Sequence, residues 1–193
     1  VLGAVSVHGL ALGYASARVS RSKNVVLVAV KECGMALRYA DPELQSDKEI
    51  VGIAIKDCGL ALEFASEELR KNRKVALAAV SNLGAALKYV FGPLRRAREV
   101  VWAAVMNDGL ALEYCNEKWR NDRDLVHAAV SNNGLALRYA SETLQRDQEI
   151  VCCAVGDFYK ALEYAHPTLL KDEKFIVVSR KLMRGRHFSP MKP

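Results

Sequence analysis

The strongest constraint on this sequence is an internal repeat with a period of 25 residues. In six copies a glycine is followed three residues later by a leucine, and two residues after that by an aromatic side chain. The glycine occurs at Gly9, Gly34, Gly59, Gly84, Gly109 and Gly134. A fixed period in this range is typical of proteins whose copies each pack only on their neighbours.

Each copy predicts one longer helix followed by two short helical pieces. In the copy 47–71, Asp47 is a candidate N-cap and Ile50, Val51, Ala54 and Ile55 form one apolar face. We expect glycine to end this helix, because it tolerates the left-handed conformation of a C-cap. The two later pieces are too short to be stable without packing. We therefore assign a structural role to Gly34, Gly59, Gly84, Gly109 and Gly134.

The predicted fold class is all-α, an α-solenoid of about seven 25-residue repeats. A leucine-rich horseshoe would need alternating strand patterns, and tetratricopeptide or HEAT repeats are longer. The expected units lie near 1–21, 22–46, 47–71, 72–96, 97–121, 122–146 and 147–171. Together they form one array over 1–171, and 172–193 is expected to be a divergent capping helix with a basic tail.

The positive charge is concentrated at the C-terminal end. The net charge is +6, and six Lys or Arg residues follow Glu173 with no acidic residue among them. The remaining 22 Lys and Arg residues balance the 22 Asp and Glu residues. We therefore expect no nucleic-acid site on residues 1–173, whereas the basic C-terminal tail could bind nucleic acid. The apolar run Val100–Met106 is far shorter than the roughly 20 residues of a membrane span; peripheral membrane association stays open.

Neither the cysteines nor the histidines form a known reactive pattern. Cys33, Cys58, Cys115, Cys152 and Cys153 include no C-x-x-C spacing. We expect free thiols in an intracellular, reducing compartment, either cytoplasmic or organellar, and no metal or cofactor. The four histidines complete no catalytic motif, so we expect no enzymatic activity.

Because residue 1 is valine, we expect the N-terminus to be incomplete and any targeting signal to be unreadable.

One variable column alternates strictly in sign: Arg38, Glu63, Lys88, Glu113, Arg138 and Glu163. It predicts an exposed ladder of ion pairs, each worth about 0 to 1 kcal/mol. The alternative is a solvated face with accidental alternation.

A second variable column contains the candidate partner-binding residues of the first helices. The column consists of Leu27, Gly52, Leu77, Trp102, His127 and Cys152. Met106 follows one turn after Trp102, and Phe91 stands where a cap is expected. Trp and Met are enriched in interface cores. The alternative is that Trp102 and Phe91 fill a gap left by small neighbours. In the basic tail, Arg184, Arg186 and Phe188 are further candidates, against the simpler interpretation of a capping segment.

The recurring pattern D-x-E-[VI]-V-x-x-A-[VI]-x-x-x-G-x-A-L-x-Y-A-S-x-x-L is nearly complete in Asp47–Leu69 and Asp147–Leu169. It resembles a tandem-repeat family catalogued as a domain of unknown function, abundant in some single-celled algae and present in effectors of intracellular bacteria. The resemblance implies helical repeats used for protein contacts and transfers no catalytic residue; an algal source would make a plastid one candidate compartment. The pattern is broken at Tyr159 and around Phe91 and Ala97.

These observations favour a non-catalytic scaffold for protein–protein contacts, a linker or accessory subunit of a larger assembly. The alternative is an adaptor that binds RNA or an anionic surface through its basic C-terminal tail.

Overall fold

Each repeat folds into one long α-helix, a six-residue 3-10 helix and a short corner piece. This all-α repeat architecture is seen in a computed structural model that describes the backbone of residues 2–185 and the side chains of residues 2–181. No strand occurs in that described part. The fold class predicted from the sequence, an α-solenoid of 25-residue repeats, is confirmed.

The α-helices that open the repeats are α1 (Leu2–Val5), α3 (Lys23–Glu32), α4 (Lys48–Asp57), α6 (Arg73–Asn82), α7 (Arg98–Asn107), α9 (Arg123–Asn132), α10 (Gln148–Asp157) and α11 (Glu173–Gly185). The 3-10 helices that follow them are η1 (Gly9–Tyr14), η2 (Gly34–Tyr39), η4 (Gly59–Phe64), η5 (Gly84–Tyr89), η7 (Gly109–Tyr114), η8 (Gly134–Tyr139) and η10 (Tyr159–Tyr164). The corner pieces are α2 (Ala17–Ser20), η3 (Leu44–Ser46), α5 (Glu67–Arg70), η6 (Leu94–Arg96), α8 (Glu117–Arg120), η9 (Leu144–Arg146) and η11 (Leu169–Lys171).

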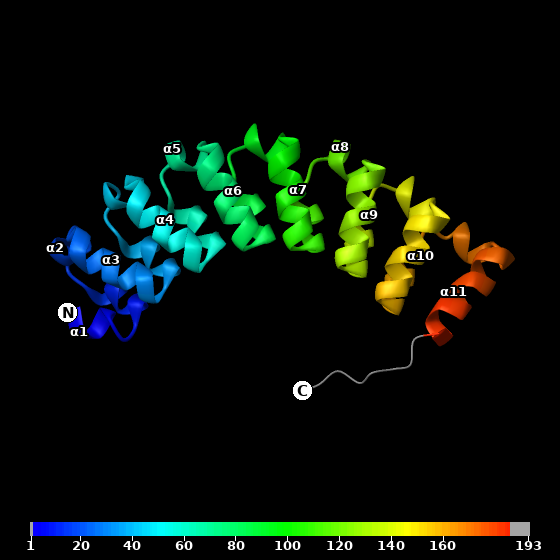
Figure 1. Ribbon diagram of the computed structural model, residues 1–193, viewed down its shortest axis with the longest axis horizontal. Helices are drawn as coiled ribbons and strands as arrows, with labels where there is room; N and C mark the ends of the chain where they lie inside the picture. Colours follow the sequence, from blue (N-terminus) through cyan, green and yellow to red (C-terminus); the bar gives the residue numbers. More distant parts are fainter. Residues whose placement is uncertain (1, 186–193) are drawn as a thin grey trace. The chain divides into compact units, whose positions relative to one another are not determined.

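The chain divides into two compact units, Val1–Asn107 and Asp108–Pro193. In the first unit, α3, α4, α6 and α7 pack side by side in sequence order (Figure 1). In the second, α9, α10 and α11 do the same. Every inner long helix therefore has a helix of the same kind on either side, which is how one short helix obtains the packing it cannot supply alone.

The cores of both units are built from the recurring alanines and leucines. Ala54 on α4 and Leu62 on η4 have no exposed surface, and the same holds for their equivalents in the neighbouring repeats. Small alanines let the long helices approach closely, while each leucine fills the space behind them. Asp47 caps α4 as predicted, since its Oδ1 accepts hydrogen bonds from Glu49 N at 2.8 Å and Ile50 N at 3.3 Å.

The expected role of the glycine column, a left-handed C-cap, is wrong. No glycine in the described residues has a positive φ. The long helix α4 instead ends at extended Cys58, whose φ is −141°, and Gly59 opens the 3-10 helix. A Cβ on Gly59 would lie 2.4 Å from the carbonyl oxygen of Ala79 in the next repeat. Glycine is required because two backbones meet there with no room for a side chain.

The same glycine also donates a hydrogen bond to the next repeat. Gly59 N donates to Asn82 Oδ1 over 2.7 Å, and Asn82 Nδ2 donates to the carbonyl oxygen of Lys56 over 3.0 Å. The pairs Gly34–Asp57, Gly84–Asn107, Gly109–Asn132 and Gly134–Asp157 make the first of these bonds at 2.7 or 2.8 Å. We call this contact, a glycine against an Asp or Asn at the end of the next long helix, the glycine clamp.

Candidate interaction surface

The alternating charged column does not form the expected ladder of ion pairs. In the described residues no ion pair joins two members of that column. The Arg38 guanidinium lies instead 5.1 Å from the ring centre of Tyr39 and 5.7 Å from that of Phe64. Arg138 bridges Tyr139 and Tyr164 in the same way. Arg38 and Arg138 therefore connect aromatic rings of successive repeats through cation–π contacts, and Lys88 lies over the ring of Tyr89 in its own repeat.

Glu113, an acidic member of this column, interacts with the hydroxyl groups of two tyrosines. Burial first, and then a hydrogen bond from the phenol to Glu113, raise the pKa of Tyr139. Burial and the negative charge of Glu113 also raise the pKa of Tyr114. The arginines of this charged column thus contact the faces of aromatic rings, whereas Glu113 contacts tyrosine hydroxyl groups. Members of both signs therefore contact the aromatic column.

One group of ion pairs that link successive repeats lies at the first turns of the long helices. Lys23 Nζ lies 2.8 Å from Asp47 Oδ2 and 2.9 Å from Glu49 Oε2. This contact and two backbone N–H groups lower the pKa of Asp47. Arg73 pairs with Glu99, and Arg123 with Asp147 and Glu149. These side chains are largely exposed, so each pair contributes little on its own.

The corner pieces are joined by one backbone bond whose flanking side chains vary. Asp41 N donates to the carbonyl oxygen of Ser20 over 3.1 Å, and Phe91 N donates to that of Arg70 over 3.4 Å. Beside the first bond Arg21 pairs with Asp41, and beside the second Lys71 Nζ lies 5.0 Å from the Phe91 ring centre. Phe91 thus has a cation–π partner where Asp41 has an ion pair, and its ring stays partly exposed.

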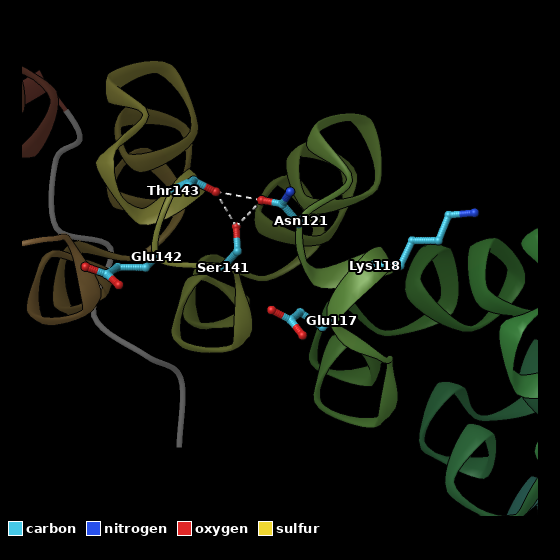
Figure 2. A pocket seen from close by; sticks show the side chains of 6 residues that line it. All are labelled: Glu117, Lys118, Asn121, Ser141, Glu142 and Thr143. Atoms are coloured by element: carbon cyan, nitrogen blue, oxygen red, sulfur yellow. Dashed lines mark hydrogen bonds between the residues drawn. The ribbon is translucent and has the colours of Figure 1, made fainter.

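A polar pocket of about 490 Å³ lies at a corner of the second unit. Figure 2 shows Asn121, Ser141 and Thr143 together on one side of it. Asn121 Oδ1 accepts hydrogen bonds of 2.6 Å from both hydroxyl groups, which themselves lie 2.8 Å apart. Glu117, Lys118 and Glu142 complete the lining. Each of the three oxygen atoms is already engaged by the others, so the cluster is a corner contact of the same kind.

All five cysteines are free thiols, as expected. Cys115 is buried in a column that carries alanine or valine in the other repeats, and burial raises its pKa to about 12. Cys152 is half-buried and burial also raises its pKa. A thiol that stays protonated is a poor nucleophile and a poor metal ligand. Cys115 therefore behaves as a small apolar core residue.

We expect the Cys115→Ala variant to depend less on pH than the wild type above pH 9. A thiol in the unfolded chain loses its proton near pH 8.5, whereas folded Cys115 keeps its proton to about pH 12. In that window the folded state binds more protons, so the stability contributed by Cys115 is full below the unfolded pKa and falls as pH rises. Urea unfolding at pH 8 and pH 10.5 measures this difference; parallel losses in both proteins would contradict it.

The long helices of the first unit also present a column of variable side chains on their outer faces. Leu27 on α3, Gly52 on α4, Leu77 on α6 and Trp102 on α7 occupy equivalent positions, and Met106 lies one turn beyond Trp102. Met106 is 60% exposed, Gly52 is exposed, and the other three are half-buried. We call these five residues the long-helix surface. It brings together Leu77, Trp102 and Met106, three of the residues singled out in the sequence.

Trp102 combines packing with an unsatisfied polar group. The Arg98 guanidinium lies 5.4 Å from its ring centre. Its indole Nε1 is buried and has no hydrogen-bond partner in the described residues. A buried donor left unpaired costs about 1 to 3 kcal/mol. Gap filling alone therefore does not account for a tryptophan here, because an apolar residue would fill the same space without this cost.

Gly52 belongs to the first-helix column that the sequence analysis names as a candidate contact surface. It lies in the middle of α4, has no positive φ, and a Cβ built on it would meet nothing within 4 Å. Neither backbone conformation nor packing requires glycine, in contrast to Gly59. The available signal was a glycine inside a helix where the neighbouring copies carry leucine.

Gly52→Ala is expected to stabilise the protein by about 0.5 to 1 kcal/mol, the usual difference between glycine and alanine inside a helix. The new methyl group enters open space, so nothing offsets the gain. Urea unfolding followed by circular dichroism measures the change. A loss of stability would show that the space beside Gly52 is needed by the fold.

The remaining candidates lie elsewhere. His127 is half-buried on α9 in the second unit. Arg184 falls within α11, but its side chain is outside the described part, and Arg186 and Phe188 lie wholly outside the described residues.

Within the described residues, no group of three or more His, Cys, Asp or Glu side chains is arranged to bind a metal ion. None of the helices in that part combines the length and the apolar character needed to cross a bilayer.

Five overlapping segments match the family model described as Domain of unknown function (DUF4116): residues 1–45, 22–70, 47–95, 98–145 and 122–171. The chain belongs to this family. The DUF4116 matches confirm the resemblance inferred from the sequence, and each of them spans about two of the 25-residue repeats. A DUF4116 unit thus includes at least one complete contact between neighbouring repeats. No match was found among the curated proteins or among the solved structures.

Proposed function

We propose that this chain is a non-catalytic scaffold for protein–protein contacts, a linker or accessory subunit that binds a protein partner through its long-helix surface. One observation supports the proposal above all others. The recurring residues are occupied by contacts between repeats, whereas the long-helix surface carries unlike side chains, including half-buried Leu77 and Trp102 and exposed Met106. A repeat protein gains specificity where its copies differ, since the positions that are alike serve stacking.

The chemistry of the surface also fits a protein partner. Tryptophan and methionine are enriched in the cores of interfaces, and exposed apolar groups gain from being covered. The five free thiols support an intracellular, reducing compartment as part of the same proposal. The alternative adaptor role depends on the basic tail, and no contact of the described residues favours it.

The proposal is tested by the partners that the protein retains in its own cells. Tagged wild type is compared with a Leu77→Glu/Met106→Glu variant and with Val177→Glu, a control in α11 whose exposure of 53% is close to the 60% of Met106. Chemical cross-linking followed by mass spectrometry identifies the bound proteins. We expect one reproducible partner to be reduced at least tenfold by the double variant and retained by the control.

Circular dichroism and thermal melting of the three proteins establish that the variants are folded. Two outcomes would contradict the proposal: a wild type without a reproducible protein partner, or a partner that the folded double variant binds as well as the wild type does. Loss of the partner from Val177→Glu as well would assign binding to a different part of the chain and would also contradict it.

A further inference from the structure

Positive charge is concentrated at a second place in the chain, within the first unit. The stretch 69–98 contains eight Lys or Arg residues and no Asp or Glu. These basic residues are Arg70, Lys71, Arg73, Lys74, Lys88, Arg95, Arg96 and Arg98. Residues 1–173 are neutral as a whole, so this stretch marks a local separation of charge within a balanced body.

The fold brings all of these residues except Lys88 to two neighbouring corners, at α5 and η6 and the first turns of α6 and α7. Phe91 N donates to the Arg70 carbonyl oxygen over 3.4 Å, and Arg73 pairs with Glu99. In Figure 1, α5 and the first turns of α6 and α7 follow one another along the same edge of the unit. We call the following seven residues the basic corner patch: Arg70, Lys71, Arg73, Lys74, Arg95, Arg96 and Arg98.

The carboxylates at these two corners neutralise less than half of the patch. Within residues 66–74 and 91–99 the acidic side chains are Glu67, Glu68 and Glu99, which leaves a net charge of +4. Each of these three carboxylates pairs with Lys71 or Arg73. Lys74 and Arg98 are exposed, and neither forms an ion pair in the part of the chain that the structure describes. The field of the patch is therefore positive with every carboxylate counted.

The two preceding corners of the first unit have opposite charges. Residues 17–24 carry a net charge of +3 and residues 41–49 a net charge of −3. Ion pairs such as Arg21–Asp41 join them, so their charges cancel. At the basic corner patch two corners of the same sign lie side by side instead. Such self-repulsion destabilises a folded chain, and an anionic partner relieves it on binding.

The start of α7 adds to the positive field. Ala97 stands where Asp47 and Asn72 accept hydrogen bonds from the first N–H groups of α4 and α6. An alanine side chain offers neither an acceptor nor a negative charge to the positive end of the helix dipole. Because Ala97 lies between Arg96 and Arg98, the dipole and the guanidinium groups attract the same anion.

The basic corner patch is continuous with the long-helix surface. Arg73 lies one turn before Leu77 on α6, and Arg98 lies one turn before Trp102 on α7. The Arg98 guanidinium contacts the Trp102 ring, with 5.4 Å to the ring centre. A partner that covers Leu77 and Trp102 therefore reaches these cations as well. Because the two preceding corners cancel, the patch does not continue as the long track of cations that a nucleic-acid backbone follows.

We propose that the basic corner patch binds a short acidic segment of the protein partner, while an apolar part of that partner covers the long-helix surface. Carboxylates of the segment meet Lys74, Arg98 and the first N–H groups of α7. Arginine suits this role because its guanidinium group can donate two parallel hydrogen bonds to one carboxylate. This inference rests on the proposed function and names the partner chemistry of the same surface.

The test uses the full chain and a displayed library of random 12-residue peptides. We expect selection on the wild type to enrich peptides in which several Asp or Glu residues stand beside Leu, Phe or Trp. A fluorescein-labelled peptide of the enriched sequence is then titrated by fluorescence anisotropy. Lys74→Glu/Arg98→Glu is expected to weaken its binding at least tenfold. Added salt should weaken binding to the wild type, because exposed charges are screened.

The matched control is Lys31→Glu/Lys56→Glu, which changes the net charge equally at exposed lysines near the opposite ends of α3 and α4. It is expected to bind the peptide as the wild type does, and circular dichroism establishes that both variants are folded. Equal weakening by the control, or full binding by folded Lys74→Glu/Arg98→Glu, would overturn the inference.

The choice of an acidic protein segment is tested against other anions in the same titration. Tighter binding of single-stranded RNA, or of vesicles that contain phosphatidylserine, than of the peptide would overturn it. No enrichment, or enrichment of basic or uncharged peptides, would do the same. If uncharged peptides are enriched and their binding still requires Leu77 and Met106, the proposed function stands although this inference fails.

Discussion

Gly59→Ala is expected to destabilise the first unit by about 3 kcal/mol or more, at the upper end of what one added methyl group costs in a packed interior. The new Cβ would lie 2.4 Å from the carbonyl oxygen of Ala79 and 3.1 Å from Leu83 Cβ. The first of these obstacles is backbone, which cannot rotate away as a side chain does. The two repeats must separate, and the clamp bond between Gly59 and Asn82 lengthens with them.

The matched control is Gly52→Ala, which makes the same chemical change one helix earlier, in open space. The two variants should therefore change stability in opposite directions. Urea unfolding followed by circular dichroism gives the sign, and amide hydrogen exchange shows whether the loss is confined to neighbouring repeats. Equal effects from the two substitutions would mean that helix propensity, and not the close approach, explains the glycine column.

Asn82→Ala is expected to cost about 1 to 3 kcal/mol, since it leaves a part-buried backbone donor without its partner. Asn82 holds two repeats from one side chain: Oδ1 accepts from Gly59 N at 2.7 Å and Nδ2 donates to the Lys56 carbonyl at 3.0 Å. Asn82→Asp keeps the acceptor and loses the donor, so we expect a smaller loss. Asp57 already fills the acceptor role toward Gly34 at 2.7 Å.

Thermal melting of the two variants beside the wild type measures this order. Lys74→Ala, an exposed change on the same helix, is the control and should be nearly neutral. A finding that Asn82→Asp is as damaging as Asn82→Ala would mean that the bond to Lys56, rather than the bond to Gly59, carries the contact.

The sequence predicts the helical repeat and its core well because both depend on short-range patterns. The period, the Asp47 cap and the apolar positions on α4 are each readable within one copy. The reason for Gly59 is not readable there, since it depends on the backbone of Ala79 in the following copy. A C-cap and a close approach both require glycine, and only the three-dimensional arrangement separates them.

The surface residues show a similar division. Arg38 and Glu63 alternate in sign in the sequence, but whether they meet each other or the aromatic rings depends on side-chain directions that the alternation does not specify. The contact of Phe91 with Lys71 of the preceding repeat likewise cannot be read from the sequence, and Phe91 stays a predicted partner-binding residue. That Gly52 faces open space depends on the neighbouring helices and is not readable from the sequence.

The corner bond has a consequence for how such a chain can vary. The N–H of each joining residue reaches a carbonyl in the preceding corner whether the joining side chain is Asp41, Ser66, Phe91, Ser141 or His166. Because backbone groups form this hydrogen bond, the side chain of the joining residue can vary without breaking it. A designer could exchange whole corners between copies, or graft a chosen recognition residue at one of them, without rewriting the modules on either side.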